Sequence, residues 1–504
     1  MKPEVNRQAS PPTLLYAACL FLASLVLWVT PAAAEEPEQA GDVIIVGGGL
    51  SGLCAAYYLK QAGVSFTLLE VAPRLGGRIR TAAYPGGLRA ETGLAELWEG
   101  NPAIDVARAL KVPLEHEETT FSSMVLEGRI EPFAQATNAA FLETVLGVKD
   151  YEAYQAWDHQ MQGHLKTLEQ RPVPPSMIAL KELSFGKWLE GQKLPPRVGA
   201  LIRAALEPEV GTTLESISAL DGIAEWHVFT APGARPHHVV GGNQRLVEAL
   251  AANLGEARLR LNKQVTHVIQ TPDGVEVRAI DTATSRVHRL SAKATVVTIP
   301  LYRLLELQFT PRLPDEYQQA IQTQGWGSYF TAHVVLDAAA ARFWTVDGRS
   351  ALPLLAGGSL GVLYSGASAD GQAGSPREVL LNLLVHGPAA EGFNARTGSL
   401  DDAQARLEEA LEQLFPGIRP LIHSWSFYRY HPRAIAAWPV GRSRFDSLSD
   451  LLRRPFGNIY FAGDFTESSH SDGAALSARR VSDQLIERLG ARKTSSSEAP
   501  RQAH

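Results

Sequence analysis

Residues 42–70 read DVIIVGGGLSGLCAAYYLKQAGVSFTLLE, and this stretch decides the fold. It opens with an apolar run, DVIIV, that is typical of a buried parallel strand, and it closes with a second such run, SFTLLE. The residues between them, 50–62, are typical of a helix that packs on a sheet. The order strand, helix, strand predicts a βαβ unit at the start of a parallel sheet.

A glycine motif joins the first strand to the helix. Gly47, Gly49 and Gly52 form GxGxxG, with Ser51 inside the motif. In such a loop the first glycine permits the tight turn, the second lets a pyrophosphate approach the backbone, and the third lets helix and strand pack closely. Glu70 ends the next strand, where a carboxylate can accept a hydrogen bond from an adenosine ribose hydroxyl, the alternative being a solvated strand-end carboxylate. This context predicts a dinucleotide site without choosing between nicotinamide and flavin.

Five further segments resemble, in order, the motifs of the flavin-dependent amine oxidases, within the larger group that includes carotenoid desaturases and protoporphyrinogen oxidases. PRLGGRIRT (73–81) is similar to the family's second flavin-contacting motif, and AETGLAELWEGNP (90–102) is similar to the segment that approaches the flavin ring. VVGGNQRLVEALAANL with RLNKQVTHV resembles the returning strand, and TIPLYRLLELQFTPRLP resembles the start of the substrate domain. NIYFAGDFTESSHSDGAALSARR resembles the carboxy-terminal flavin motif, so the resemblance runs from about residue 42 to 489.

The resemblance implies FAD as the cofactor and assigns residues to it. Arg78 can pair with the pyrophosphate, beside a second glycine pair that includes Gly77. Asp464 can accept hydrogen bonds from ribityl hydroxyls, and the helix that begins near Gly473 would turn its positive end to the flavin pyrimidine. Further contacts are expected at Gly93, Val265 (through its backbone, at the adenine), Gly463 and Ala474.

We expect the flavin to be bound without a covalent link. Several family members attach it through a cysteine near the carboxy-terminal motif, but no cysteine follows Cys54 in this sequence. A thioether-linked flavin is therefore excluded, and we predict non-covalent FAD. Cys54 itself is expected to be a buried helix thiol.

Two positions depart from the family pattern and are our candidate catalytic residues. Family amine oxidases usually carry a lysine in the stretch corresponding to TIPLYRLLELQF, where it is implicated in the reaction of reduced flavin with oxygen. The matching position here is Glu306, and no lysine lies between Lys293 and Lys493. A carboxylate would repel a superoxide-like anion, which puts oxygen reactivity in doubt. Trp438 is our candidate for an aromatic wall that faces the flavin, with ordinary core packing as the alternative.

Other side chains are weaker candidates for the substrate site. The aromatic-rich segment before Trp438 also contains Trp425, Phe427, Tyr428 and Tyr430. His470 and Asp472 lie in the short linker before Gly473, where they either face substrate or belong to a surface loop. No metal constellation is present, because the pair His237 and His238 has no further ligands nearby in the sequence.

The amino terminus has the pattern of a secretory signal. Lys2 and Arg7 precede the apolar run Leu14–Val29, and Ala32 and Ala34 follow it. We predict a signal peptide over 1–34, cleaved after Ala34, and hence an exported protein. The alternative is an uncleaved membrane anchor. The flank has no Arg-Arg pair, which favours the general secretory route.

Chain length predicts at least two domains, because 504 residues exceed what one hydrophobic core usually supports. We predict an α/β fold (α+β overall) in which a discontinuous Rossmann-like FAD-binding domain carries an inserted substrate domain of mixed sheet and helix. The FAD-binding domain is assigned 42–100, 237–300 and 440–490, and the substrate domain 101–236 and 301–439, with 102–236 mostly helical. Residues 491–504 are expected to be disordered. The net charge of −6, without a basic patch, argues against a nucleic-acid partner.

These patterns predict an exported FAD-dependent oxidoreductase that takes hydride from the carbon bearing an amine and leaves an imine. Its partners would be a small amine and an electron acceptor, either oxygen or a quinone or protein. Two alternatives stay open: a desaturase or dehydrogenase acting on an apolar substrate with a non-oxygen acceptor, and a catalytically weak flavoprotein. The fold resemblance does not choose between them, because function resides in the site.

Overall fold

The computed structural model describes residues 36–116, 122–133, 137–226, 235–366, 377–395 and 398–491, apart from the side chain of Tyr430. The predicted signal peptide, 1–34, and all but the first residue of the predicted tail, 491–504, lie outside the described residues. Among the helices that are described, none is long and apolar enough to cross a membrane.

A five-stranded sheet forms the centre of the first half of the fold. Its strand order is β11-β3-β2-β15-β24, and every neighbouring pair is parallel. The strands are β2 Val43–Val46, β3 Phe66–Leu69, β11 Leu259–Arg260, β15 Ala294–Val297 and β24 Ile459–Phe461. All except β11 are fully buried, as expected for parallel strands that are covered on both faces. The sheet is therefore assembled from separate stretches of the chain.

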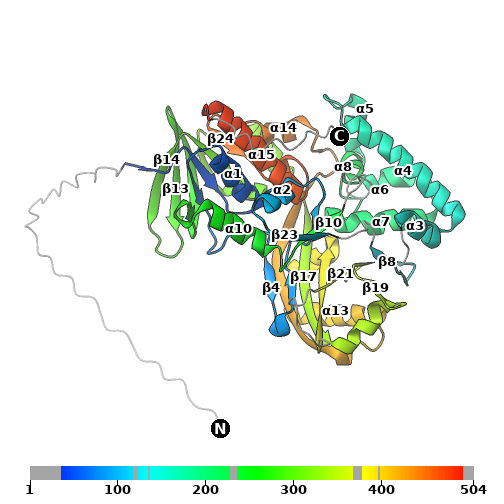
Figure 1. Cartoon of the computed structure of the whole chain (residues 1–504). Coiled ribbons are helices and arrows are strands. Elements are labelled where there is room, and N and C mark those ends of the chain that lie inside the picture. Colours follow the sequence, from blue (N-terminus) through cyan, green and yellow to red (C-terminus); the bar gives the residue numbers. More distant parts are fainter. Residues whose placement is uncertain are drawn as a thin grey trace, which may run out of the picture. The chain divides into compact units, whose positions relative to one another are not determined.

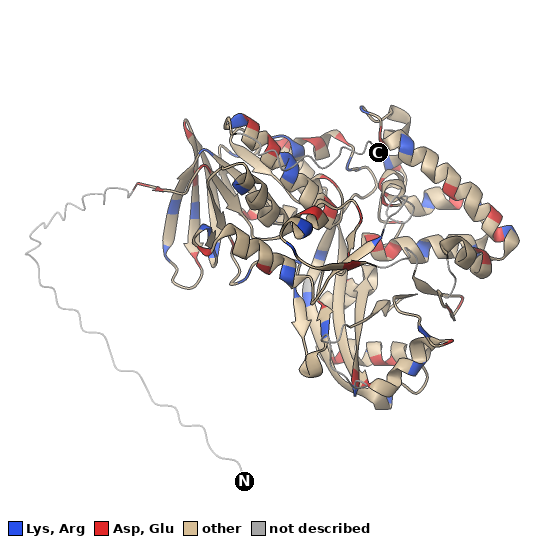
Figure 2. Cartoon of the chain, viewed as in Figure 1, with Lys and Arg blue, Asp and Glu red and all other residues tan. Residues whose placement is uncertain are grey.

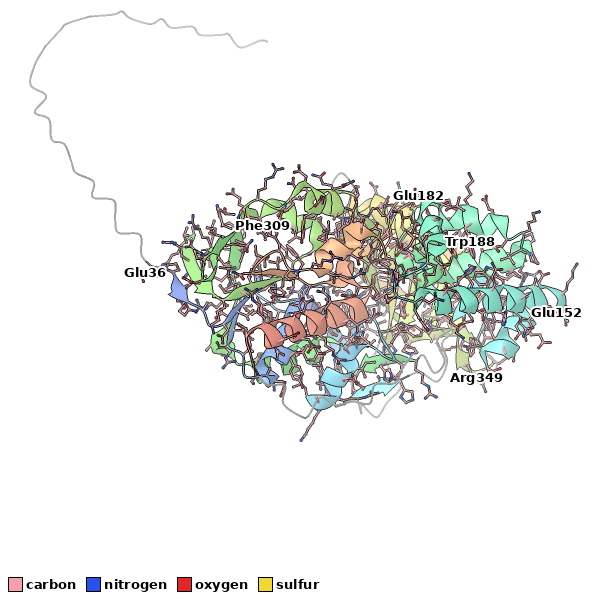
Figure 3. All side chains as sticks on the ribbon, turned by 90° about the horizontal axis from the view of Figure 1, so that it is seen from above. Glu36, Glu152, Glu182, Trp188, Phe309 and Arg349 are labelled. Carbon is pink, nitrogen blue, oxygen red and sulfur yellow. The ribbon has the colours of Figure 1, made fainter. Side chains whose placement is uncertain are left out.

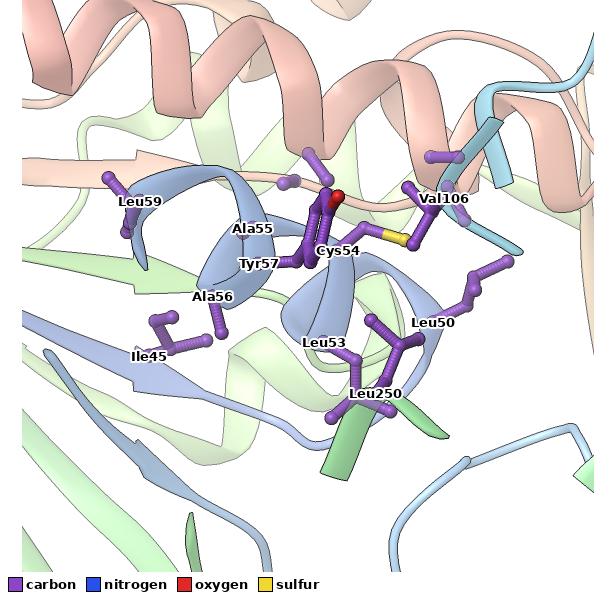
Figure 4. Close-up of a cluster of buried hydrophobic side chains, with 14 of the residues drawn as sticks. Ile45, Leu50, Leu53, Cys54, Ala55, Ala56, Tyr57, Leu59, Val106 and Leu250 are labelled. Carbon is purple, nitrogen blue, oxygen red and sulfur yellow. The ribbon is translucent and has the colours of Figure 1, made fainter. Parts of the chain in front are cut away.

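Three helices cover one face of this sheet. They are α1 Leu50–Gln61, α10 Gln244–Leu254 and α15 Ser471–Arg488, and α1 packs against both of the others (Figure 1). Figure 4 shows the Cys54 side chain of α1 directed toward Val106 within this apolar cluster. Burial raises the pKa of Cys54 to about 12, which makes it the inert thiol that the sequence predicts.

A meander whose three central strands are antiparallel, with a parallel strand at each edge, covers the other face. Its strands, in the order β1-β14-β13-β12-β16, are β1 Glu38–Gln39, β14 Val287–Ala292, β13 Gly274–Asp281, β12 Lys263–Thr271 and β16 Gln308–Thr310. Ile44 and Val46 of the parallel sheet share one apolar core with Val268 and Val277 of the meander. Helices α11 (Asp315–Gln322) and α14 (Ser447–Arg453) pack against each other beside this core.

The second half of the fold is a seven-stranded sheet with helices against it. The order is β23-β17-β22-β21-β20-β8-β9, antiparallel except for the β20–β8 pair. The strands are β23 Ile422–Ala437, β17 Gly325–Asp337, β22 Glu378–His386, β21 Gly361–Ser365, β20 Leu354–Gly357, β8 Ser123–Leu126 and β9 Arg129–Glu131. Helices α12 (Gly387–Asn394) and α13 (Leu400–Leu414) belong to the same half.

A helical insert continues this half. Its helices are α3 Asn138–Leu146, α4 Val148–Leu168, α5 Pro175–Ile178, α6 Phe185–Gly191, α7 Pro196–Val210 and α8 Ala219–Glu225. Helix α7 contacts β8, β20 and β22, so it joins the insert to the sheet. Figure 3 shows Trp188 among these helices and Glu152 at the outer end of α4. Figure 2 shows acidic and basic residues interspersed over helices and sheets alike.

Several short elements complete the fold. They are α2 Pro102–Ala109, the sheet β6-β10-β7 (Leu97–Trp98, Pro236–Val239 and Leu114–His116), the hairpins β4-β5 (Thr81–Ala83 and Arg89–Glu91) and β18-β19 (Thr345–Val346 and Arg349–Ser350). The expectation that 102–236 is mostly helical holds from α3 onward, but β7, β8 and β9 precede it. These three strands are short, and β7 and β8 also pair with strands distant in the sequence, so local composition gives little sign of them.

The predicted fold class is confirmed. A parallel sheet built from discontinuous segments carries a second half of mixed sheet and helix. The strands of the parallel sheet come from within 42–100, 237–300 and 440–490, while the seven-stranded sheet comes from within 101–236 and 301–439. The domain boundaries themselves stay predictions.

Candidate active site

The glycine loop after β2 has the geometry that its motif predicts. Gly47 has φ +112°, and a Cβ there would lie 2.6 Å from Thr298 Oγ1. A Cβ on Gly52 would lie only 2.0 Å from the Gly47 carbonyl oxygen, so neither position can carry a side chain. Gly49, at the N-cap of α1, has no heavy atom within 4 Å of such a Cβ. The loop is thus closed on the sheet side and open beside Gly49, at a helix amino terminus that favours anions.

The second glycine pair packs directly on this loop. The Gly76 amide donates to the Gly48 carbonyl at 2.8 Å. Gly77 has φ +55°, and a Cβ there would lie 3.2 Å from Gly49 Cα. The two motifs therefore meet backbone to backbone, which leaves the approach to Gly49 free of side chains from this pair.

Glu70 is held at the same loop. Its Oε2 accepts from the Gly48 amide at 2.6 Å and its Oε1 from the Ala72 amide at 2.8 Å. The side chain is half-buried at the end of β3. Each carboxylate oxygen keeps a second lone pair, so these backbone bonds leave room for a ribose hydroxyl. Glu70 fixes the loop, and its contact with a ribose stays a prediction.

Arg78 and Asp464 come together in one ion pair. The guanidinium donates to both carboxylate oxygens, at 2.8 and 2.9 Å, and also to the Ala434 carbonyl of β23. The Asp464 side chain is 4% exposed, while that of Arg78 is 41% exposed. The sequence assigns these residues to separate parts of the cofactor, whereas the structure makes them one unit that joins the second motif to the carboxy-terminal motif.

Ser51 and the carboxy-terminal glycines are linked through a serine that the sequence reasoning missed. Ser477 Oγ lies 3.3 Å from Ser51 Oγ, accepts from the Gly463 amide at 2.8 Å and donates to the Ala474 carbonyl at 2.8 Å. Ser51 therefore faces α15 and not the loop opening. The one available signal for Ser477 was its position one turn beyond Gly473 on the predicted helix.

Gly473 and Val265 are two further cofactor candidates. A Cβ on Gly473 would lie 2.2 Å from the Ser468 carbonyl oxygen, which explains the glycine at the start of α15. Val265, 8% exposed on β12, belongs to the apolar core that contains Val46 and Leu69, the last residues of β2 and β3. The Lys263 amide, two residues earlier, donates to the Glu70 carbonyl at 2.8 Å, so this part of β12 lies at the carboxyl end of β3, where nucleotides bind in such sheets.

Gly93 is held in place by the second half of the fold. A Cβ there would lie 2.1 Å from the Arg78 carbonyl oxygen. The preceding carbonyl, of Thr92, accepts from Thr331 Oγ1 on β17 and from His431 Nε2 on β23, each at 3.1 Å. Burial first, and then the nearby Arg78 charge, lowers the pKa of His431 to about 4. His431 is therefore neutral near pH 7, with its proton on Nε2.

The carbonyl of Glu91 is held in the same way. It accepts from His333 Nε2 at 3.0 Å and from Asn382 Nδ2 at 3.2 Å. Burial lowers the pKa of His333 to about 4, and its Nδ1 accepts from the Tyr84 hydroxyl at 2.6 Å. We name Thr331, His333, Asn382 and His431 the carbonyl clamp. None was predicted, although a histidine inside the apolar strand FTAHVVLD is a visible signal.

Glu306 is largely exposed in the structure, and its place at the flavin stays a prediction. It ends a short 3₁₀ turn, Leu301–Glu306, its side chain is 56% exposed, and its carboxylate accepts from Arg303 at 2.6 Å. A carboxylate this exposed and already paired has little electrostatic influence on a buried centre. The geometry therefore does not support a catalytic role for Glu306.

Trp438 is a core residue in the structure. It is 1% exposed, its indole Nε1 donates to Ser449 Oγ at 3.2 Å, and the Arg444 guanidinium lies 4.6 Å from its ring. Trp438 is therefore packed in the core, which was the alternative to an aromatic wall, and its ring has no free face. Phe427 and Trp425 stack on each other, and Tyr428 hydrogen-bonds to Tyr84.

An acid–base cluster adjoins the carboxy-terminal motif. Buried Glu225 of α8 forms an ion pair with Arg444 and accepts from Ser469 Oγ at 2.5 Å and from His470 Nε2 at 2.9 Å. Arg444 also pairs with buried Asp221 at 2.8 Å. Burial lowers the pKa of His470, but the charge of Glu225 above all outweighs it and raises the pKa to about 9. His470 is therefore an imidazolium near pH 7, and not part of an unconstrained surface loop.

The comparisons with known proteins identify the family. The family model for flavin-containing amine oxidoreductases matches residues 50–486. The chain belongs to this family. A probable flavin-containing monoamine oxidase A from Dictyostelium discoideum is 23% identical over 89% of this chain and 98% of its own length. A polyamine oxidase from Zea mays is 25% identical over 94% of this chain and 95% of its own length.

Solved structures of oxidases share the fold. A wild-type putrescine oxidase bound to putrescine has a TM-score of 0.71 at 20% identity, covering 90% of this chain and 100% of its own. A cyclohexylamine oxidase from Brevibacterium oxydans has a TM-score of 0.72 at 18% identity, with the same coverage. At these identities the likeness establishes the architecture of this flavin-containing family.

Family membership makes the protein an FAD-dependent oxidoreductase, and the site fits that cofactor. The open space beside Gly49, the side-chain-free approach along Gly77 and the partly exposed Arg78 guanidinium suit a dinucleotide pyrophosphate. Glu70 and Asp464 offer carboxylates at the positions where hydroxyls of the cofactor are expected. FAD supplies the hydride acceptor, and the chain supplies binding and orientation.

Proposed function

We propose that this protein oxidises a small amine to the corresponding imine, which water then hydrolyses. The proposal rests on the family match over residues 50–486, in which the relatives with curated names include monoamine and polyamine oxidases. In this reaction the carbon next to nitrogen loses a hydride to FAD, and the nitrogen loses a proton.

The roles that we assign to the chain are positional. The carbonyl clamp fixes the Thr92–Gly93 backbone from one side, and the Arg78–Asp464 pair fixes the second motif from the other. The acceptor of the pair, Asp464, is buried, and so are the four donors of the clamp, which favours a fixed geometry. The result is a rigid segment at Gly93, where the resemblance places the flavin ring.

A second candidate is an FAD-dependent dehydrogenase or desaturase that passes electrons to a quinone or a protein. Two observations favour it. No lysine lies between Lys293 and Lys493, and Trp438 is buried in the core and so forms no aromatic wall. Both features differ from what we expect of an oxidase that cages an amine and uses oxygen.

We further propose that the protein is exported. The support is the sequence alone: a basic flank, the apolar run Leu14–Val29 and small residues at Ala32 and Ala34. Amino-terminal sequencing of the processed protein should find Glu35 as the first residue. A start at Met1 would indicate an anchor.

An anaerobic bleaching screen tests the proposed reaction. The yellow holoprotein is mixed without oxygen with primary amines, secondary amines, amino acids and polyenes, and the loss of visible flavin absorbance is recorded. We expect amines to bleach the flavin, and oxygen or a quinone dye is then added to identify the acceptor. Bleaching by polyenes alone would establish the second candidate, and the absence of any bleaching would reject both.

A further inference from the structure

His470 lies where the carboxy-terminal flavin motif meets the acid–base cluster. It is the N-cap of α15, three residues before Gly473, and its carbonyl accepts from the Ala474 amide at 3.2 Å. Its ring contacts Glu225 of α8, a helix of the other half of the fold. One residue therefore connects the segment that carries the flavin motif with a buried group of charges.

Contacts on both sides of His470 hold its backbone in place. Ser469, the preceding residue, donates through Oγ to Glu225 at 2.5 Å. Ser468 Oγ donates to both carboxylate oxygens of Asp472, each at 2.9 Å, and so closes the turn that leads into α15. The position of the His470 ring relative to the start of α15 is therefore fixed.

The His470 ring carries a positive charge near pH 7. Its Nε2 lies 2.9 Å from the carboxylate of Glu225, whose side chain is only 3% exposed. Burial lowers the pKa of His470, but the charge of Glu225 above all outweighs this and raises the pKa to about 9. A buried carboxylate beside an imidazole stabilises the charged ring in this way.

The four charges of the cluster form a chain of ion pairs. His470 pairs with Glu225, Glu225 with Arg444, and Arg444 with Asp221. The last three side chains are all buried, and they belong to α8 and to the segment before α14. The cluster is neutral as a whole, but the member that lies at the start of α15 is the positive one, His470.

We propose that His470 raises the reduction potential of bound FAD by holding a positive charge at the amino end of α15, where Glu225 positions it. The family's carboxy-terminal motif places the flavin pyrimidine at this end of the helix. FAD that takes up two electrons and one proton gains one negative charge, which a helix amino terminus favours. An adjacent imidazolium adds to that effect in poorly solvated surroundings. The inference concerns the cofactor and not the substrate, so it goes beyond the proposed amine oxidation.

Reduction potentials of the FAD-loaded protein test this without any substrate. The protein is reduced stepwise with dithionite at pH 7 beside a redox dye, and the two absorption spectra give the equilibrium between flavin and dye. His470→Gln keeps a donor toward Glu225 but removes the charge. We expect it to make flavin reduction at least about tenfold less favourable, which is about 30 mV for a two-electron couple. His470→Lys restores a positive charge and should recover most of the lost potential.

Arg488→Gln is the control, because it removes a positive charge from the other end of the same helix. It should leave the potential unchanged. Asp472→Asn is a second variant, which decides if His470→Gln does not retain FAD. It removes a negative charge from the first turn of α15, so it should shift the potential in the opposite direction, upward.

An unchanged potential in His470→Gln would overturn the proposal. So would a lowered potential that His470→Lys does not recover, because the ring would then act through its shape and not through its charge. An Asp472→Asn potential at or below that of wild type would overturn it as well. Failure of the proposed function is a separate outcome: a flavin that no amine bleaches, but whose potential follows these charges, would reject amine oxidation and leave the role of His470 standing.

Discussion

Arg78 and Asp464, 386 residues apart in the chain, form an ion pair through two parallel hydrogen bonds of 2.8 and 2.9 Å. The pair connects the second flavin motif with the carboxy-terminal one, and a further bond from Arg78 to the Ala434 carbonyl adds β23. Two-point pairing of this kind fixes orientation as well as distance. The relative position of these three segments therefore depends on one buried carboxylate.

Replacing Asp464 with Asn should loosen this junction. Asn keeps one acceptor but removes the charge, so Arg78 loses a charged hydrogen bond, worth about 1–3 kcal/mol. We expect the free energy of unfolding to fall by that order and FAD to be retained less well. Urea unfolding and flavin retention on a desalting column measure the two effects. Arg303→Gln, which breaks an exposed pair, is the control and should change stability by less than about 0.5 kcal/mol. Equal effects of the two variants would contradict the importance of the junction.

Ser477→Ala should be more damaging than its small change in volume suggests. The substitution leaves the buried Gly463 amide without its acceptor, at a cost of about 1–3 kcal/mol. Ser482→Ala is a matched control on the same buried face of α15, because Ser482 only donates to the Ala55 carbonyl. Thermal unfolding should show a clearly larger loss for Ser477→Ala, together with weaker FAD retention. A similar small loss for both serines would show that Ser477 does not organise the cofactor segments.

The parts of the site that the sequence predicts are those set by local geometry. A glycine that must turn at φ +112°, as Gly47 does, or must approach another carbonyl closely, as Gly52 does, is visible because no other residue fits. The fold class was predictable because the glycine motif and the later family motifs occur in a fixed order along the chain. The carbonyl clamp was missed because its donors come from strands that meet Thr92 and Glu91 only after folding.

The two candidate catalytic residues show what the sequence could not predict, which is the exposure of each side chain. Glu306 and Trp438 were placed by alignment with family segments, without information on exposure. The structure exposes more than half of the Glu306 side chain and buries nearly all of Trp438. The Glu225–Arg444–His470 cluster was beyond reach for a related reason: its members become neighbours only when α8 packs against the carboxy-terminal motif.

Buried histidines should set the pH range of stability. Burial lowers the pKa of His333, His386 and His431 to about 4, so between pH 6.5 and 4 the unfolded chain binds protons that the folded protein does not. The free energy of unfolding should therefore fall as pH drops through this window, by about 1.4 kcal/mol per pH unit for each such proton.

His470 affects the free energy of unfolding on the alkaline side of neutral pH. Its pKa is raised to about 9, so its contribution is complete below pH 6.5 and is lost as pH rises toward 9. Together these groups predict a maximum of stability near pH 6.5. Urea unfolding from pH 4 to 9 measures the profile. His431→Gln should flatten the acid limb only, and His470→Gln the alkaline limb only; a profile that neither variant changes would contradict these assignments.

Glu70→Ala should weaken FAD binding by about 1–3 kcal/mol, because it removes a charged acceptor from the glycine loop. The Gly48 and Ala72 amides also lose their partner, so part of the effect comes from a loosened loop. Glu70→Gln keeps one acceptor oxygen and should lose less. Equilibrium titration of the flavin-free protein with FAD measures both. Unchanged affinity in Glu70→Ala would remove Glu70 from the site.

The reduced flavin should reoxidise slowly in air, and Glu306 should have no part in this. No lysine lies between Lys293 and Lys493, so this long segment cannot place a lysine ammonium beside the flavin, where a positive charge would stabilise a superoxide-like anion. Each tenfold gain in rate requires about 1.4 kcal/mol of transition-state stabilisation. A charge introduced at Glu306 cannot supply it, because that side chain is 56% exposed and water screens it.

We therefore expect slow reoxidation by oxygen, faster reoxidation by a quinone dye, and the same rates in Glu306→Lys. Stopped-flow mixing of photoreduced protein with aerated buffer measures all three. A marked acceleration in Glu306→Lys would show that this position reaches the flavin after all.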